Sequence, residues 1–136
     1  MNKIFLIDDD EDDQLFFRDA IESINPLLKC DTATNGKMAL DKLKVSTSLP
    51  DLIFLDLNMP VMNGFEFLIQ IKKENHLNKI PIGIFTTSNN LRDKELTNEF
   101  GAKFFLTKPN DFQVLRKKLQ QILSEDFSTE EYISIT

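Results

Sequence analysis

Short apolar runs alternate along the chain with segments in which apolar residues recur every three or four positions. The runs predict five strands, and the segments between them predict five helices. Regular alternation of this kind indicates right-handed crossovers between parallel strands, with helices on both faces of one sheet. We therefore expect an α/β fold with a doubly wound parallel sheet. The predicted strands are 4–7, 28–32, 52–55, 82–85 and 104–106, and the helical segments begin at Leu15, Met38, Phe65, Leu91 and Phe112.

Helix-ending and helix-starting residues support these boundaries. Pro26 is expected to stop the first helix, because proline cannot continue a helical hydrogen-bond pattern. Asn35 is a candidate N-cap, Asn63-Gly64 opens the third helix, and Gly101 is a candidate C-cap for the fourth. We expect one domain over 1–124, followed by a frayed tail over 125–136. A short strand or docking segment in that tail is the alternative.

Composition changes this picture little, but charge adds one feature. The 136 residues are 41% hydrophobic and 28% charged, as in ordinary folded domains. The net charge of −6 equals that of the acidic run 8–13 alone, so the acidity is local and argues against a nucleic-acid partner. One cysteine cannot form an internal disulfide. Without a signal-peptide pattern or an apolar run of about 20 residues, we expect a cytoplasmic protein that does not enter the membrane.

Polar side chains follow four of the predicted strands. The carboxyl ends of parallel strands share one edge of the sheet, and ligands of such folds bind there. We therefore expect these side chains to lie close together. They are Asp8 and Asp9 after the first strand, Asp56 and Asn58 after the third, Thr86 and Thr87 after the fourth, and Thr107, Lys108 and Pro109 after the fifth.

Three carboxylates and a lysine at one edge indicate metal and phosphoryl chemistry. Carboxylates a few ångströms apart cannot all stay ionised without a cation. Oxygen ligands favour Mg²⁺, which keeps several waters and often binds a phosphate at the same time. A carboxylate can also accept a phosphoryl group, and a lysine and a hydroxyl can neutralise the phosphoryl oxygens.

Four motifs in order resemble the receiver domain of response regulators in two-component signalling. They are LIDDD at 6–10, DLIFLDLNMPVMNG at 51–64, PIGIFTTS at 81–88 and GAKFFLTKP at 101–109. The resemblance runs from residue 3 to about residue 124. It implies a flavodoxin-like sheet with strand order 2-1-3-4-5.

The resemblance also implies roles for the acids. Asp56 would be the phosphoacceptor, served by a histidine kinase or a histidine phosphotransfer protein. Asp9, Asp56 and the backbone carbonyl of Asn58 would bind Mg²⁺ directly, and Asp8 would bind it through a water. The chain would be a phosphoacceptor that catalyses its own phosphotransfer and dephosphorylation, and not otherwise an enzyme.

The remaining implied residues lie on the last two strands. Lys108 would contact the phosphoryl group, Thr86 would donate a hydrogen bond to it, and the Lys108–Pro109 peptide would be cis. Phe105 takes the place of the family's switch aromatic, often tyrosine, and Phe104 replaces a small residue. Because side chains alternate along a strand, we expect one of these two phenylalanines to face outward, and we assign Phe104 to a partner-binding surface.

Two positions would influence the lifetime of the phosphorylated state. By resemblance, the side chains two residues beyond Asp56 and Thr86 affect attack by water, and here they are Asn58 and Ser88. Both are small and polar, so we expect slow hydrolysis.

Simpler readings account for several other residues. Asp10, Glu11, Asp12 and Asp13 are explained by the preference of acids for a helix N-terminus. An EF-hand loop in this run is rejected, because it lacks glycine at its sixth position and glutamate at its twelfth. His76 is expected to be a solvated loop residue, and Cys30 a strand residue without a redox role.

The sequence favours a stand-alone switch whose phosphorylation changes a protein-binding surface, as a monomer or a phosphorylation-dependent dimer. Its output would be contact with a downstream protein target. The alternatives are a phosphorelay intermediate and a receiver-like module that binds partners without phosphorylation. A phosphohydrolase of the haloacid dehalogenase type is disfavoured, since its motif needs an aspartate where Asn58 stands.

Overall fold

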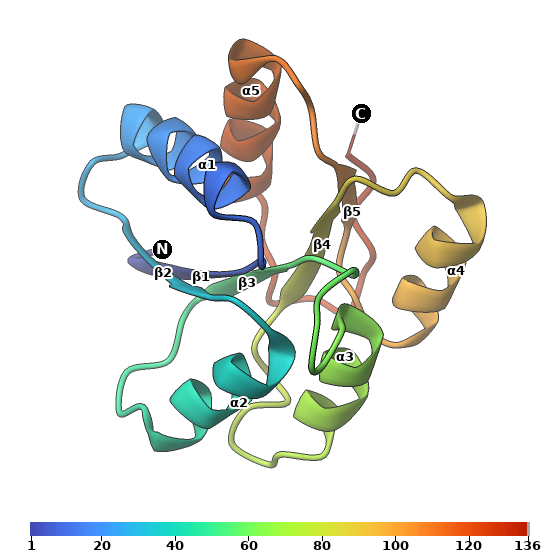
Figure 1. The fold of residues 1–136 in the computed structure, drawn as a ribbon. Helices are drawn as coiled ribbons and strands as arrows, with labels where there is room; N and C mark the ends of the chain where they lie inside the picture. Colours follow the sequence, from blue (N-terminus) through green and yellow to red (C-terminus); the bar gives the residue numbers. More distant parts are fainter. Residues whose placement is uncertain (136) are drawn as a thin grey trace.

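A computed structural model describes residues 1–135. Five parallel strands form one sheet in the order β2-β1-β3-β4-β5, with helices on both faces (Figure 1), which confirms the predicted fold. The strands are β1 (Lys3–Ile7), β2 (Lys29–Ala33), β3 (Leu52–Leu55), β4 (Ile82–Thr86) and β5 (Phe105–Thr107). The helices are α1 (Glu11–Ile24), α2 (Gly36–Val45), α3 (Gly64–Lys72), α4 (Leu91–Glu99) and α5 (Phe112–Leu123).

The helices begin where the sequence offers a capping side chain. Asn35 accepts a hydrogen bond from the Met38 amide, and Asn63 forms a capping box with Glu66. The fourth helix ends at Glu99, and Gly101 follows with a φ of 94°, a backbone conformation that glycine adopts without steric penalty. These caps confirm the predicted starts of α2 and α3.

Two hydrophobic layers enclose the sheet. One layer joins α1 and α5 to the sheet and is built around Phe17, Phe54 and Leu119. The other joins α2 and α3 to the opposite face and contains Leu40, Phe67 and many aliphatic side chains. With both faces covered, β3 and β4 are buried along their whole length, which explains their continuously apolar sequences.

Both phenylalanines near β5 are buried, so the prediction that Phe104 faces a partner is wrong. Phe104 and Phe105 do point to opposite faces of the sheet, but each face is covered. Phe104 is fully buried and packs edge-on against Phe54. Its ring fills the space above Gly83 of β4, where a side chain would collide with it. Phe105 is 7% exposed, and the Lys94 ammonium lies 5.7 Å from its ring centre.

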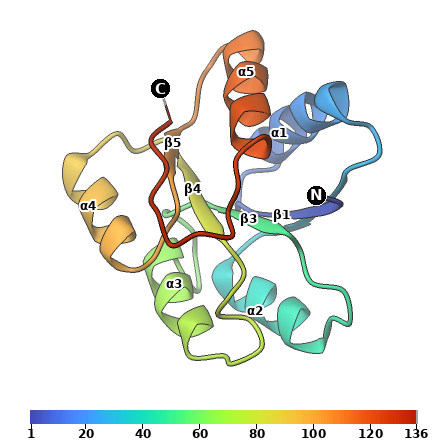
Figure 2. The ribbon, with the colours of Figure 1, turned by 180° about the vertical axis from the view of Figure 1, so that it is seen from behind.

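The C-terminal tail also differs from expectation. Instead of fraying, it turns back after α5 and runs alongside β5 (Figure 2). The Ile133 amide donates a hydrogen bond of 2.7 Å to the Lys103 carbonyl, and the Phe127 ring lies 5.9 Å from that of Phe104. Its alternating half-buried isoleucines, Ile133 and Ile135, pack on the α1–α5 layer.

Two further expectations concern the backbone and the membrane. The structure has no cis peptide bond within residues 1–135, so the expected cis bond between Lys108 and Pro109 is wrong. Trans is the lower-energy isomer even before proline, and it is compatible here with the 2.7 Å hydrogen bond from the Lys108 amide to the Thr86 carbonyl. Within the same residues, no helix is both long enough and apolar enough to cross a bilayer.

Candidate functional site

Two neighbouring strands bring three acids together. Ile7 at the end of β1 pairs with Leu55 at the end of β3, so the residues that follow them meet at one edge of the sheet. Asp8 is fully buried, Asp56 is 6% exposed, and Asp9 faces solvent. One carboxylate oxygen from each of the three lies within 4.8 Å of the others.

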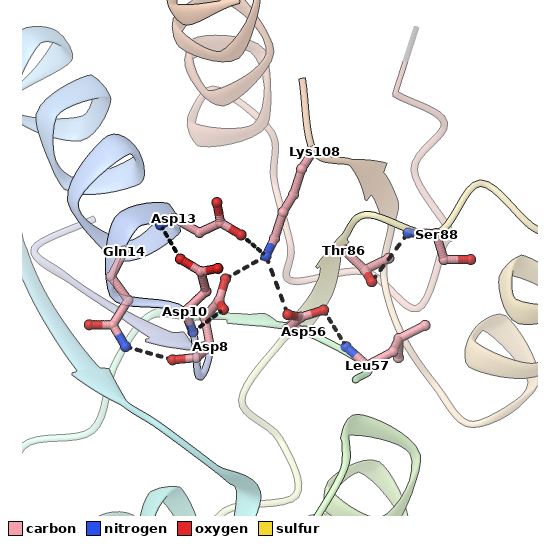
Figure 3. Close-up of polar contacts among 9 residues, drawn as sticks. All are labelled: Asp8, Asp10, Asp13, Gln14, Asp56, Leu57, Thr86, Ser88 and Lys108. Carbon is pink, nitrogen blue, oxygen red and sulfur yellow. Dashed lines mark hydrogen bonds and ion pairs between the residues drawn. The ribbon is translucent and has the colours of Figure 1, made fainter. Parts of the chain in front are cut away.

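Lys108 reaches this cluster from the end of β5. Its Nζ lies 2.7 Å from Asp8 Oδ2, 2.7 Å from Asp13 Oδ2 and 3.3 Å from Asp56 Oδ2 (Figure 3). The Lys108 side chain is only 9% exposed, and the ammonium donates all three of these contacts. Three segments far apart in sequence, those after β1, β3 and β5, therefore converge on one partly buried ion cluster.

The electrostatics of the cluster are set by burial and by these contacts. The pKa of Asp8 is raised to about 6, chiefly by burial and also by the neighbouring Asp56 charge, although hydrogen bonds from Lys108 and the Asp10 amide act to lower it. Burial alone would lower the pKa of Lys108, but its bonds to Asp13 and Asp8 and the Asp56 charge raise it above its ordinary value. Lys108 therefore stays positively charged, and its single positive charge is smaller than the summed negative charge of the carboxylates around it.

Asp13 is the member of the cluster that the sequence did not reveal. It was assigned to the solvated start of a helix, and its side chain is indeed 38% exposed. It lies in the first turn of α1, where a helical side chain leans towards the N-terminus and hence over the sheet edge. That lean brings its carboxylate to Lys108. Asp10 fits the expected role better, since it caps α1 by accepting from the Asp13 amide.

Backbone groups hold the two buried carboxylates in place. Asp8 Oδ1 accepts a 3.0 Å hydrogen bond from the Asp10 amide, and Gln14 Nε2 donates to the Asp8 carbonyl at 2.5 Å. Asp56 Oδ1 accepts from the Leu57 amide at 2.8 Å. The start of α3 lies against the same loop: a Cβ on Gly64 would fall 2.4 Å from the Asp56 carbonyl oxygen. Only glycine permits that approach.

Thr86 and Ser88 border the cluster at the end of β4. Thr86 is fully buried, and its hydroxyl oxygen accepts a 3.4 Å hydrogen bond from the Ser88 amide. Ser88 donates its own hydroxyl to Asp93 of α4 at 2.7 Å, while its carbonyl accepts from Thr107 at 2.8 Å. Thr87, the next residue along the chain, is exposed.

The donor set suits a hard divalent cation. Asp8, Asp9 and Asp56 offer carboxylate oxygens close enough to share one ion, and Asn58 lies exposed in the loop after β3. Mg²⁺ prefers such oxygen ligands and retains waters, which the exposed side of the site would supply. His76 lies on a turn after α3 and Cys30 lies on β2, so neither contributes a nitrogen or sulfur ligand to this site.

Comparisons with known proteins agree with this geometry. Residues 4–120 match the response regulator receiver domain family. Protein PilH of Pseudomonas aeruginosa is 29% identical over 125 residues, which cover 91% of this chain and 99% of PilH. Other relatives are much longer, and the chain spans only 13% to 27% of several of them.

Solved structures give the same result. The Mn²⁺-bound form of response regulator Rcp1 superposes with a TM-score of 0.81 at 27% identity, covering 100% of this chain and 99% of that one. The phosphorylated cyanobacterial phytochrome response regulator RcpA also has a TM-score of 0.81, at 29% identity, with 89% and 90% of the two chains covered. The chain belongs to the response regulator receiver domain family.

Proposed function

We propose that this domain accepts a phosphoryl group on Asp56, with Mg²⁺ bound beside it, from a phosphohistidine of a histidine kinase or a phosphotransfer protein. The observation that carries the proposal is the contact of one buried ammonium, Lys108 Nζ, with Asp56, Asp8 and Asp13 at the carboxyl edge of the sheet. The phosphorylated RcpA and Mn²⁺-bound Rcp1 structures support it by similarity.

The transfer forms one bond and breaks another. A carboxylate oxygen of Asp56 attacks phosphorus, the nitrogen–phosphorus bond of the donor breaks, and the imidazole nitrogen keeps the bonding electron pair. The Leu57 amide holds Asp56 Oδ1, and Lys108 faces Oδ2, so the carboxylate is oriented before the donor arrives. Because catalysis of phosphoryl transfer is mainly positioning and charge neutralisation, these fixed groups suit the reaction.

The metal would be held by Asp9, Asp56 and the Asn58 carbonyl, with Asp8 acting through a water. Bound Mg²⁺ would neutralise charge on the phosphoryl oxygens. Lys108, whose Nζ faces Asp56 Oδ2, would supply a second positive charge.

The switch would run through Thr86 and Phe105. In this proposal the long hydrogen bond of 3.4 Å from the Ser88 amide to the Thr86 hydroxyl breaks, and the hydroxyl donates a hydrogen bond to the phosphoryl group. Phe105 would respond by changing its packing under Lys94 on α4, which alters the surface that a downstream protein contacts.

The phosphorylated state would be long-lived. The Ser88 hydroxyl donates a hydrogen bond to Asp93, and the Asn58 side chain is an amide and not a carboxylate. Neither side chain would therefore act as a general base for an attacking water.

The test is incubation of the full chain with acetyl phosphate or phosphoramidate, with and without Mg²⁺, followed by intact-mass measurement. We expect a gain of one phosphoryl group that requires Mg²⁺. The Asp56→Asn variant is the matched control, because it keeps the shape of the side chain and removes the nucleophile. No gain under any condition would contradict the proposal and leave a module that acts by binding alone.

A further inference from the structure

We propose that the outer edge of β5 is a docking groove for an extended acidic segment of a partner protein, and that the chain's own tail, 127–135, occupies it when no partner is present. The strand order leaves β5 at the edge of the sheet, where backbone groups are open to pairing. The tail takes that place and runs up beside the strand between α4 and α5 (Figure 2). This inference does not depend on phosphorylation.

The tail is anchored at three points. At one end the Phe127 ring packs on Phe104. In the middle, Lys103 Nζ donates a 2.7 Å hydrogen bond to the Thr129 carbonyl. Further along, the Ile133 amide donates to the Lys103 carbonyl in the manner of an added strand. An aromatic residue followed by an extended stretch is therefore the pattern that the groove binds.

The charge of the groove selects an acidic occupant. Lys72, Lys79 and Lys103 line a cavity of about 320 Å³ that remains between the tail and the starts of β4 and β5. Burial lowers the pKa of Lys72, and repulsion from the charges of Lys103 and Lys79 lowers it as well. Among the described residues of the tail, Glu130 is the one acid that lines this cavity; its carboxylate is 3.9 Å from Lys103 Nζ and is otherwise fully exposed.

The tail is an incomplete occupant of this groove, which makes it exchangeable. Between residues 103–107 and the tail, the described structure has a single backbone hydrogen bond, that of Ile133. The lysines that line the cavity are only partly neutralised by the tail. A partner segment with more carboxylates would pair with these lysines, and so displace the tail.

Hydrogen exchange on the full chain tests whether the tail is released separately from the fold. The reference is the Ile84 amide, which donates to the Phe104 carbonyl inside the sheet. We expect the Ile133 amide to be protected at least tenfold relative to an unstructured peptide, yet to exchange at least 100-fold faster than Ile84. Equal rates for the two amides would show that the tail opens only with the whole domain. A fully unprotected Ile133 would show that it does not dock. Either result overturns the proposal.

A peptide tests the groove itself. A fluorescently labelled peptide with the sequence of residues 125–136 is titrated into the wild type and into Phe127→Ala, read by polarisation. We expect at least tenfold tighter binding to the variant, whose own tail is weakened, and at least tenfold weaker binding of a peptide with its four acids replaced by amides. Leu27→Ala, at a side chain 87% exposed and remote from the groove, is the control and should bind as the wild type does.

If Phe127→Ala does not fold, Ile133→Pro weakens the tail by removing the amide donor and leaves the Phe127 ring in place. Equal affinity of the wild type and the weakened-tail variant would overturn the proposal. A doubling of mass in sedimentation, with tails exchanged between copies, would assign the groove to a second copy of this chain and would equally overturn it.

Discussion

The packing of Phe104 over Gly83 predicts a specific failure when alanine replaces that glycine. A Cβ at position 83 would lie 1.8 Å from Cζ and 2.0 Å from Cε2 of the Phe104 ring, whereas carbon atoms in contact are normally separated by about 3.5–4.0 Å. The ring would have to retreat by nearly 2 Å. It cannot do so freely, because Phe54 and Phe127 border it with ring centres at 5.6 and 5.9 Å.

The magnitude follows from this overlap. Overpacking of a well-filled core costs about 1–3 kcal/mol, and a collision with a bordered ring belongs at the upper end. Alanine in a strand recovers roughly 0.5–1 kcal/mol of backbone entropy relative to glycine. We therefore expect Gly83→Ala to lose about 2–2.5 kcal/mol of unfolding free energy, which for a domain of this size lowers the Tm by roughly 10 °C.

A double-mutant cycle separates this cause from a general sensitivity of β4. Urea unfolding is measured for the wild type, Gly83→Ala, Phe104→Leu and the double variant. The smaller leucine makes room for the new methyl group, so the double variant should be more stable than the sum of the single effects by at least about 1 kcal/mol. Additive effects, or an unchanged stability of Gly83→Ala, would refute the reasoning.

Three further predictions concern the site and the lone thiol. Ser88→Glu should change the rate of phosphoryl loss from Asp56, followed by the decay of the phosphorylated mass, and an unchanged rate would show that position 88 does not face the attacking water. Lys108→Met should tighten Mg²⁺ binding about tenfold in a calorimetric titration, because the ammonium no longer competes with the metal for the carboxylates; equal or weaker binding would contradict this. Burial raises the pKa of Cys30 to about 11. Its alkylation by iodoacetamide at pH 8 should therefore be at least ~100-fold slower in the folded protein than in urea, and equal rates would rule out the burial.

The sequence predicted the fold and most of the acid cluster because their signals are local. Each strand was placed to within one residue at both ends, and 52–55 coincides with β3, since buried parallel strands are continuously apolar. Asp8, Asp9, Asp56 and Lys108 were brought together by a rule of topology alone: parallel strands end at one edge.

The errors arise where a residue's surroundings depend on distant parts of the chain. Whether Phe104 is exposed depends on a glycine in the neighbouring strand and on a tail that folds back, and neither partner is visible from alternation along β5. The contact of Asp13 with Lys108 depends on the height of the first turn of α1 above the sheet edge. Such distances are set by packing between layers, which hydrophobic periodicity does not encode.

The most direct measurement of the central claim is the position of the phosphoryl group. The phosphorylated full chain is reduced with borohydride, which converts an aspartyl phosphate to homoserine, and the modified residue is located by peptide mass spectrometry. Three other acids, Asp8, Asp9 and Asp13, lie within reach of the same lysine or metal site. The experiment therefore distinguishes Asp56 from three neighbouring candidate phosphoacceptors. The account predicts homoserine at Asp56 alone; modification at any of the other three with Asp56 intact would contradict it.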